Sequence, residues 1–547
     1  MSSTDMQRSD IVILGGGLAG LTLAIQLKRQ DPGIGIVVLE RRTHPVEEAA
    51  FKVGESTVEI GARYFAHVLG LREHLEREHI RKFGFRFFFS EGRSDLDRCT
   101  ELGVSQPLPT PSWQIDRGRF ENFLGTHARA LGIDFRDGAT VRAIELGSGD
   151  GDHQVRYEHA DGSTEIAARW LVDASGRAGL LKRKLGLAQP NAHDVNSAWW
   201  RVEGHVDPAQ WSRDPQWLSR CDPPERWRST NHMVGPGYWF WMIPLSSGAH
   251  SLGIVADEAA HPLAGINSHD KAMAWLREHQ PGVAAQLDDP RHRLRDFLFL
   301  RHFSYGCKQV FSGDRWALTG EAGLFLDPFY SPGSDFIAIA NGYIADLVAR
   351  DRAGQPFAPY AGIWEQVFQG FYANTMTLYQ DQYPIFGDEW LLPIKVTWDY
   401  TYYWALLAPL YYADKLTDAP FLGRMRPLFE DGRALNLAVQ PLLRDWCARN
   451  AAAGMDAPAD PPRPMLDQYP VDWFHELNRA LSDPLDDAAL FARMQANVAR
   501  MRWLAARILQ WARKAHPDIA DHGLEALLAA QPAVPEDLSQ QWFEAAA

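Results

Sequence analysis

The chain has few cysteines, and no two of them stand at a metal-binding spacing. The only four in its 547 residues are scattered at Cys99, Cys221, Cys307 and Cys447. This scarcity argues against a disulfide scaffold and a cysteine-ligated metal, so we expect no metal site. The same usage predicts a reducing compartment, the cytoplasm.

Basic charge and long apolar runs are scarce as well. The chain carries 55 Lys and Arg against 69 Asp and Glu, a net charge of −14, whereas a nucleic-acid-binding protein needs a basic face. No apolar run approaches the length of a membrane span, and the opening residues, MSSTDMQRSD, hold no apolar signal core. We therefore expect no nucleic-acid partner and no transmembrane segment.

Aromatic residues, by contrast, are abundant. The chain holds 20 Trp, 16 Tyr and 27 Phe within an otherwise ordinary globular composition of 46% hydrophobic and 23% charged residues. Its length predicts more than one domain or subdomain. Rings in this number build cores and also flat apolar pockets.

Residues 10–20, DIVILGGGLAG, predict a dinucleotide-binding turn. A short apolar strand runs into glycines at the G-x-G-x-x-G spacing and then into a helix over 18–29. The first glycine permits the tight turn, the second lets backbone approach a pyrophosphate, and the third lets helix pack on strand. The helix N-terminus offers N–H groups to the phosphates. A second strand ends at Glu40, where an acid typically holds a ribose hydroxyl.

The rest of the chain reads as one interleaved α/β unit followed by helices. Glycine-bounded strands are predicted between 133 and 168, with Asp161-Gly162 as a hairpin turn. Residues 195–305 form a strand-rich insert, and an apolar helix is predicted over 334–350. From about 351 onward the pattern is helical and rich in aromatic residues.

Four further segments carry a resemblance to a known family. They are DASGR at 173–177, WFWMIP at 239–244, GEAG at 320–323 and FLDPFYSPG at 325–333. The second matches the pattern W-x-W-x-I-P in full, and the last fits F-x-x-P-x-x-S-x-G. With the glycine turn, these segments make residues 10–350 resemble the flavin-dependent halogenases, within the FAD-dependent monooxygenases.

This resemblance implies a fold and a division into domains. It implies an FAD-binding Rossmann-like domain interleaved with a β-sheet substrate domain, as in the aromatic hydroxylases, and a mainly α-helical C-terminal region. The domains expected are a module over 1–350, with its insert at about 195–305, and a region over 351–547. Tyr330 stands where tryptophan halogenases carry a glutamate, so the chain resembles the phenol- and pyrrole-type branch.

The resemblance also implies a chemistry. Reduced FAD, supplied by a separate flavin reductase, activates O2, and chloride or bromide is oxidised to hypohalous acid. A lysine then directs the halogen to an electron-rich aromatic ring, phenolic or pyrrole-like, free or bound to a carrier protein. Desolvation favours the neutral amine such a lysine needs. Such chemistry belongs to secondary metabolite biosynthesis.

Site residues are expected by position in these motifs. The catalytic candidates are Lys82, Ser331, Trp239 and Trp241. The cofactor-binding candidates are Gly15, Gly17, Leu18, Ala19, Gly20, Glu40, Arg41, Lys52, Glu55, Ser56, Arg117, Asp173, Gly176, Gly320, Glu321, Pro328, Gly333 and Ser334.

Several of these residues have a second interpretation. Lys82 could be an exposed lysine at a strand start, with Lys52 as its rival. Trp239 and Trp241 alternate on a strand and could belong to the core. Arg117 could pair with a flavin phosphate or with a surface acid.

The function has alternatives too. In this family the halide rests on backbone N–H groups after the serine, but Pro332 has none. This departure leaves open an FAD-dependent hydroxylase, or another oxidoreductase of the same fold that uses no halide. A non-catalytic flavin-binding or carrier-docking protein is the alternative from a different class.

Overall fold

A computed structural model describes residues 7–48, 53–455 and 465–529. The chain forms two compact units, each assembled from separate stretches. The first contains residues 1–79, 115–192 and 304–373, and the second contains 80–114, 193–303 and 374–547. The division expected at residue 350 stays a prediction.

The first unit is built on a largely parallel sheet with the order β7-β2-β1-β10-β9-β8, and β18 also pairs with β10. Parallel pairing joins β1 to both β2 and β10, which is the arrangement of a Rossmann-like fold. Its strands are β1 (Gln7–Leu14), β2 (Ile36–Glu40), β7 (Asp134–Asp137), β8 (Thr140–Glu145), β9 (His153–His159), β10 (Gly162–Asp173), β11 (Ala188–Gln189), β17 (Gly306–Cys307) and β18 (Trp316–Leu318).

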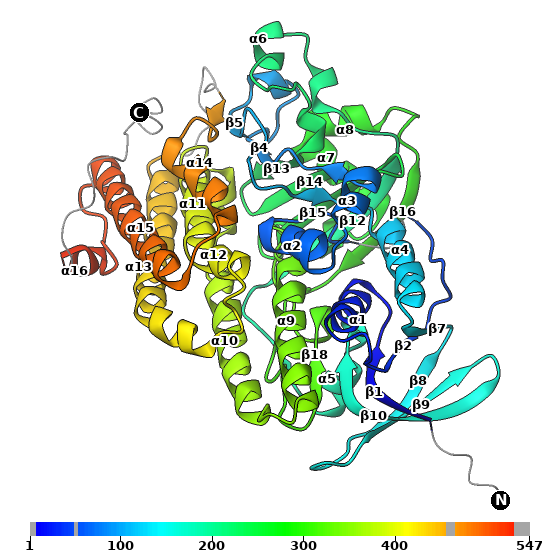
Figure 1. Ribbon diagram of the computed structural model, residues 1–547. Coiled ribbons are helices and arrows are strands. Elements are labelled where there is room, and N and C mark those ends of the chain that lie inside the picture. Colours follow the sequence, from blue (N-terminus) through cyan, green and yellow to red (C-terminus); the bar gives the residue numbers. More distant parts are fainter. Residues whose placement is uncertain (1–6, 49–52, 456–464, 530–547) are drawn as a thin grey trace, which may run out of the picture. The chain divides into compact units, whose positions relative to one another are not determined.

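Helices α1 and α9 pack against each other in this unit (Figure 1). The helices are α1 (Leu18–Gln30), α2 (Glu59–Arg63), α3 (Arg72–Glu78), α4 (Arg117–Ala130), α5 (Leu180–Lys184), α9 (Gly333–Arg352) and α10 (Ala358–Met376), which ends in the second unit. Shorter turns are η1 (Tyr64–Val68), η3 (Gly176–Ala178) and η7 (Gly320–Ala322). The hairpin expected at Asp161-Gly162 is confirmed, since Gly162 pairs with His159.

A buried amide ties these helices to the sheet. Asn341 of α9 donates to the carbonyl of Ala19 at 3.2 Å and to the Tyr64 hydroxyl at 2.9 Å. It accepts a hydrogen bond of 2.7 Å from Thr319, which follows β18. Because a fully satisfied buried network fixes its partners, Asn341 sets α1 and α9 in register with the strand ends.

The second unit contains a sheet with the order β16-β12-β15-β14-β13-β4-β5-β19. Its strands, with the separate pair β3 and β6, are β3 (Ile80–Arg81), β4 (Phe85–Phe88), β5 (Glu101–Gly103), β6 (Trp113–Gln114), β12 (Val195–Glu203), β13 (Thr230–Gly235), β14 (Tyr238–Pro244), β15 (Ala249–Asp257), β16 (Leu294–Leu300) and β19 (Leu466–Asp467).

Helices of this unit cover the sheet and form the C-terminal bundle. They are α6 (Pro215–Leu218), α7 (His269–His279), α8 (Pro281–Leu287), α11 (Leu391–Tyr402), α12 (Ala408–Tyr412), α13 (Ala419–Ala452), α14 (Asp472–Arg479), α15 (Asp487–Ala515) and α16 (Leu524–Ala529). Shorter turns are η2 (Leu96–Arg98), η4 (Pro208–Trp211), η5 (Arg226–Arg228), η6 (Leu263–Gly265), η8 (Tyr383–Gly387), η9 (Tyr403–Leu407) and η10 (Ala480–Ser482). The fold class expected from the sequence is confirmed.

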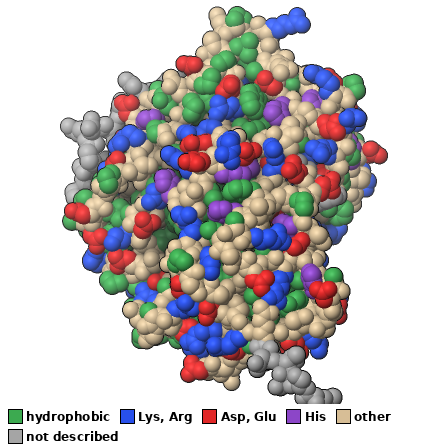
Figure 2. Space-filling view, turned by 45° about the vertical axis from the view of Figure 1, so that its right-hand side comes forward, with side chains coloured by type: hydrophobic (Ala, Val, Ile, Leu, Met, Phe, Trp, Pro, Cys, Tyr) green, Lys and Arg blue, Asp and Glu red, His purple; other side chains and the backbone are tan. Residues whose placement is uncertain are grey.

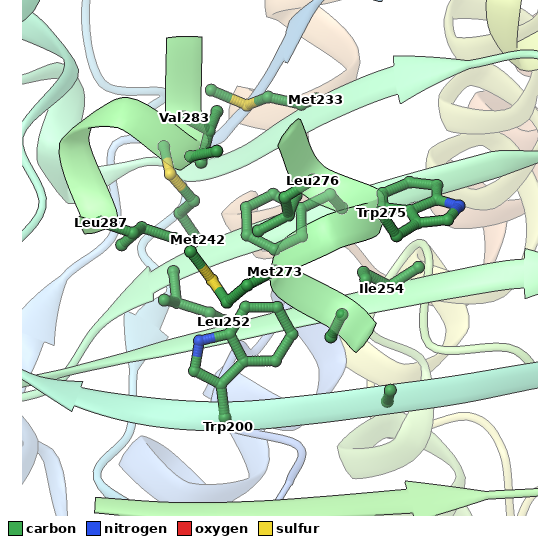
Figure 3. Packing of buried hydrophobic residues seen from close by; sticks show 14 of the residues in the cluster. Trp200, Met233, Met242, Leu252, Ile254, Met273, Trp275, Leu276, Val283 and Leu287 are labelled. Carbon is green, nitrogen blue, oxygen red and sulfur yellow. The ribbon is translucent and has the colours of Figure 1, made fainter. Parts of the chain in front are cut away.

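One face of this sheet forms a hydrophobic core with α7 and α8. Trp200, Met242 and Leu252 point from the strands toward Met273 and Leu276 of α7 (Figure 3). Because side chains alternate along a strand, this packing leaves the residues between them, including Trp239 and Trp241, for the opposite face.

The surface carries charges of both signs, in keeping with the composition. Acidic and basic side chains are interspersed over the face in Figure 2. No helix within the described ranges is long and apolar enough to cross a membrane.

In the aromatic run 398–413, Trp398 and Trp404 are buried, and Trp398 donates to Asn436 at 2.9 Å, so much of the run belongs to the helical core.

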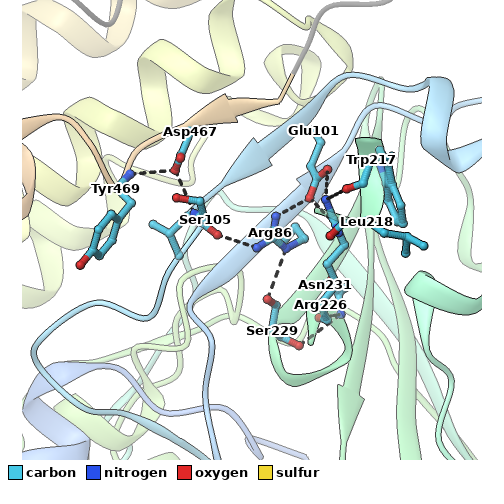
Figure 4. A network of polar contacts seen from close by, with 11 residues as sticks. Arg86, Glu101, Ser105, Trp217, Leu218, Arg226, Ser229, Asn231, Asp467 and Tyr469 are labelled. Atoms are coloured by element: carbon cyan, nitrogen blue, oxygen red, sulfur yellow. Dashed lines mark hydrogen bonds and ion pairs between the residues drawn. The ribbon is translucent and has the colours of Figure 1, made fainter. Parts of the chain in front are cut away.

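A buried charge cluster fixes the edge of the second sheet (Figure 4). Glu101 of β5 pairs with Arg86 of β4 and, at 2.8 Å, with Arg226. Arg86 and Arg226 also donate to the carbonyls of Val104 and Trp217 at 2.7 and 2.8 Å. Burial alone would raise the pKa of Glu101, but the two guanidinium groups outweigh it and lower that pKa below its usual 4.5.

We expect Glu101→Gln to destabilise the protein by about 3–5 kcal/mol, because it leaves two buried guanidinium groups without their carboxylate. Denaturant unfolding measures this loss. Glu203→Gln, at an exposed pair with Arg293, is the control and should cost under about 1 kcal/mol.

The pH dependence follows from the direction of the shift. A carboxyl group whose folded pKa is lowered stabilises the fold above its unfolded pKa, and this contribution is lost as pH falls toward the folded pKa. Wild-type stability should therefore fall below about pH 4.5 more steeply than that of Glu101→Gln. Equal unfolding free energies for the two proteins would contradict this account.

Candidate functional site

In the first unit, the glycine turn is packed backbone against backbone. Gly15 follows β1 with φ +113°, and a Cβ there would lie 2.3 Å from the carbonyl oxygen of Ala174. A Cβ at Gly20 would lie 2.0 Å from the carbonyl oxygen of Gly15. Real Cβ atoms do not approach so closely, so both positions require glycine.

The middle glycine is different, because its surroundings are open. Gly17 is the N-cap of α1, and a Cβ there would meet no atom within 4 Å. The first-turn N–H groups of Leu18 and Ala19 have no partner within the helix. A pyrophosphate therefore has both space and donors at this helix N-terminus, as the dinucleotide-binding turn expected from the sequence requires.

Glu40 is held in place at the end of β2. One carboxylate oxygen accepts from the N–H of Gly16 at 2.7 Å, and the other accepts from Arg42 at 2.8 Å. Each oxygen keeps a second lone pair, so Glu40 can still accept a ribose hydroxyl. Arg41 is exposed beside it, and Lys52 lies outside the described residues.

The DASGR segment forms the turn after β10. Asp173 is level with Leu14 at the adjacent strand ends. Its carboxylate accepts from the N–H groups of Ser175 at 3.0 Å and Leu181 at 2.7 Å. Burial raises the pKa of Asp173, and these hydrogen bonds oppose the shift. Asp173 thus shapes the turn that holds Gly176 at φ +61°.

The GEAG segment packs directly on α1. Gly320 has φ +60°, and a Cβ there would lie 2.9 Å from the Cβ of Ala19. Glu321 is half-buried, and burial raises its pKa although Arg177, 3.9 Å away, opposes the shift. Lys182 donates to the carbonyl of Gly323 at 3.0 Å and fixes the end of this turn.

The two other sequence-predicted regions of this unit are Glu55-Ser56 and Arg117. Glu55 and Ser56 are buried, and the carbonyl of Glu55 accepts from Ile115 at 2.5 Å. Arg117 pairs with Glu121 at 2.7 Å, and its Nη1 donates to the carbonyl of Val53 at 2.8 Å. The acid beside Arg117 is therefore buried, not on the surface.

The serine turn leads into α9. Ser331 has φ +56°, a conformation rare for a residue other than glycine, and its N–H donates to Pro328 at 2.8 Å. Pro332 is the N-cap, and Gly333 is exposed with open space where a Cβ would be. Ser334 is buried, with its hydroxyl 2.2 Å from where a Gly61 Cβ would be.

In the second unit, Lys82 is buried between β3 and β4. Only 4% of it is exposed, so its interpretation as an exposed lysine is wrong. Its Nζ lies 3.4 Å from the ring centroid of Phe85, and its backbone N–H donates to Ser112 at 2.9 Å. The amine is therefore held against an aromatic ring and away from bulk water.

Trp239 and Trp241 share the same face of β14. Trp239 donates to the Tyr383 hydroxyl at 3.0 Å, and Trp241 donates to Ser251 at 3.2 Å. The indole of Trp241 covers Gly253, where a Cβ would lie 2.2 Å from the ring. Both indoles are thus fixed at the N–H group as well as by packing.

His232 joins the lysine region to the tryptophans. Its ring stacks on Phe87 with centroids 4.9 Å apart, and it lies 5.5 Å from Phe85 and 5.3 Å from Trp239. Burial, with a smaller contribution from the Lys82 charge, lowers the pKa of His232 to about 3, which leaves the imidazole neutral. We call Lys82, Phe85, Phe87, His232, Trp239 and Trp241 the aromatic face.

Three residues of this region, His232, Tyr383 and Gly253, were not predicted from the sequence. No local motif marks them, because each meets its partner through sheet pairing or across a long separation in sequence. The strand alternation that placed Trp239 and Trp241 on one face could have identified His232, had the β13–β14 pairing been known.

Comparison with known proteins supports the flavin assignment. A family model described as an FAD binding domain matches residues 8–247. The chain is 25% identical over 441 residues to the flavin-dependent halogenase chlA of Dictyostelium discoideum, covering 75% of this chain and 72% of that protein. It is 27% identical over 399 residues to the 1H-pyrrole-2-carbonyl peptidyl-carrier-protein chlorinase of Pseudomonas fluorescens, covering 68% and 83% respectively.

Solved structures share the fold. The halogenase PltM in complex with phloroglucinol and FAD aligns with a TM-score of 0.63 at 20% identity, covering 89% of this chain and 99% of that one. The chain is therefore an FAD-dependent enzyme. The geometry of the glycine turn and the α1 N-terminus is compatible with that cofactor.

We expect Gly20→Ala to abolish FAD binding or prevent folding, because the added methyl group meets backbone that cannot move aside. Flavin fluorescence after reconstitution measures binding, and a thermal melt measures folding. Gly342→Ala in α9, where a Cβ has open space, is the matched control and should bind FAD normally. Normal FAD affinity in Gly20→Ala would refute the packing argument.

Proposed function

We propose that this chain, which is similar to flavin-dependent halogenases over most of its length, halogenates an electron-rich aromatic substrate. The proposed reaction uses reduced FAD, O2 and chloride or bromide, with hypohalous acid as the agent that reaches Lys82. The observation that carries the proposal is the burial of Lys82 against Phe85, on the same sheet face as Trp239 and Trp241.

The roles proposed for the chain's own residues are those that the resemblance to the flavin-dependent halogenases implies. When bound and reduced, FAD supplies the activation of O2 that oxidises the halide. Lys82 receives hypohalous acid at Nζ, by hydrogen bonding or as a haloamine, and presents the halogen to the substrate ring. Phe85 and His232 exclude water from the amine. Trp239 and Trp241 are proposed to shield the substrate from direct hydroxylation.

The cofactor-binding residues keep the roles proposed from sequence. Gly15, Gly17 and Gly20 shape the turn, and the α1 N-terminus with Leu18 and Ala19 receives the pyrophosphate. The remaining residues proposed to contact FAD are Glu40, Arg41, Lys52, Glu55, Ser56, Arg117, Asp173, Gly176, Gly320, Glu321, Pro328, Gly333 and Ser334. Ser331, with its positive φ, is proposed to hold the loop beside the flavin.

The proposed substrate is phenolic or pyrrole-like, either free or bound to a carrier protein. A relative named for a pyrrole on a peptidyl carrier protein and another named a tetracycline 7-halogenase support this chemical class. A separate flavin reductase is the proposed source of reduced FAD, because the sequence holds one dinucleotide motif placed after a strand.

We expect Lys82→Ala to lower the halogenation rate at least about a hundredfold, which is the typical contribution of a positioned proton-transfer or nucleophilic group. Product formation is followed by mass spectrometry in assays with FAD, flavin reductase, NADH, O2 and bromide. FAD affinity should be unchanged, and Lys271→Ala, a surface lysine on α7, should react at the wild-type rate. Unimpaired halogenation by Lys82→Ala would refute the role of this lysine.

The second candidate is an FAD-dependent hydroxylase that uses no halide, and Pro332 favours it. As the N-cap of α9, Pro332 removes an N–H group that could hold a halide beside Ser331. If the protein is a halogenase, Gly333 and its neighbours must supply the remaining donors.

We expect Pro332→Ala to lower the KM for bromide severalfold, because the substitution adds an N–H group at the helix N-terminus. Steady-state assays at varied bromide measure the KM. Gly342→Ala, inside α9 and with open space for a Cβ, controls for general effects of substitution on this helix. An unchanged bromide KM would show that halide does not rest at this turn.

A further inference from the structure

A small cavity lies within the C-terminal helices of the second unit. Its volume is about 160 Å³, and its lining combines Leu477, Leu481 and Leu490 with Trp404 and Arg500. These residues come from η9, α14, η10 and α15, and η9 lies against both α14 and α15. The cavity shares no residue with the aromatic face.

Four charged side chains line this cavity: the carboxylates of Glu476 and Asp483 and the guanidinium groups of Arg493 and Arg500. Glu476 pairs with Arg479 at 2.7 Å, while Asp483 pairs with Arg479 at 3.1 Å and with Arg493 at 3.0 Å. Arg500 has no ion pair with any residue that the structure describes. Its Nη1 donates a long hydrogen bond of 3.4 Å to the side-chain oxygen of Asn497.

Two donors in the lining lack an acceptor. The Nε of Arg500 and the indole Nε1 of Trp404 are buried, and neither has a hydrogen-bond partner within the described part of the chain. Trp404 is only 2% exposed and stacks on Tyr400, with centroids 5.1 Å apart. Burial lowers the pKa of Arg500, and the charge of Glu476 opposes this shift. An unpaired guanidinium in a half-buried setting is costly, and an anion would remove that cost.

The size of the cavity limits the occupant. A cavity of about 150 Å³ lined by apolar side chains is large enough to hold benzene. The leucines and Trp404 provide the apolar wall that a ring requires, and Arg500 provides the charge that a carboxylate requires. We propose that this cavity binds a small aromatic carboxylate, with the ring between the leucines and the carboxylate on Arg500. The proposal is independent of the proposed halogenation.

Calorimetric titration of the full chain with benzoate tests the proposal, with neutral benzamide as the matched ligand. We expect saturable one-site binding of benzoate and at least about tenfold weaker binding of benzamide, because a charge-assisted hydrogen bond is lost. Arg500→Met should weaken benzoate binding by a similar factor, while Arg426→Met, an exposed arginine on α13, should leave it unchanged.

A second variant covers the case in which Arg500→Met fails to fold. Ala480→Leu fills part of the cavity but retains Arg500, and it should also abolish benzoate binding. Absence of saturable benzoate binding to the wild-type chain would overturn the proposal. Unchanged affinity in a folded Arg500→Met or Ala480→Leu variant would place benzoate elsewhere and overturn it equally.

Discussion

The contact on which the first unit depends is backbone against backbone at the ends of two parallel strands. At Gly15 the turn after β1 touches the carbonyl of Ala174 after β10, and Gly20 of α1 touches the carbonyl of Gly15. Since a single methyl group would break either contact, these glycines fix the distance between helix and sheet. Gly320 packs closely against Ala19 in the same way, and Asn341 links α9 to the carbonyl of Ala19.

This packing also determines what the turn between β1 and α1 can bind. Among the glycines of the turn between β1 and α1, Gly17 alone lies in open space, and it stands where the free N–H groups of α1 begin. The tight glycines therefore shape the turn, while the open one leaves access for a phosphate. Glu40, oriented by Gly16 and Arg42, completes a site whose geometry suits a dinucleotide.

In the second unit, strand alternation gives the two faces of the sheet different side chains. One face of the sheet meets α7 and α8 in a closed apolar core. The other brings Lys82 against Phe85 and joins it through His232 to Trp239. A buried amine among rings is kept from bulk water, which is the environment that the proposed halogen chemistry requires.

The sequence predicted what short segments encode, and missed what long-range pairing creates. The glycine turn, its following helix and the Asp161-Gly162 hairpin each depend on neighbouring residues, and the structure confirms them. The burial of Lys82 could not be decided from its neighbours, because the strands that cover it come from distant segments. His232 meets Phe87 through β13–β4 pairing, and Tyr383 meets Trp239 across 144 positions. The roles of the individual site residues stay predictions.

The identity of the product tests the central claim most directly. Wild-type protein with FAD, flavin reductase, NADH, O2 and bromide would be offered phenols and a carrier-bound pyrrole, and the products weighed by mass spectrometry. The account predicts a product with the bromine isotope doublet. A product that gains one oxygen atom and no bromine would contradict it, and would identify the enzyme as a hydroxylase.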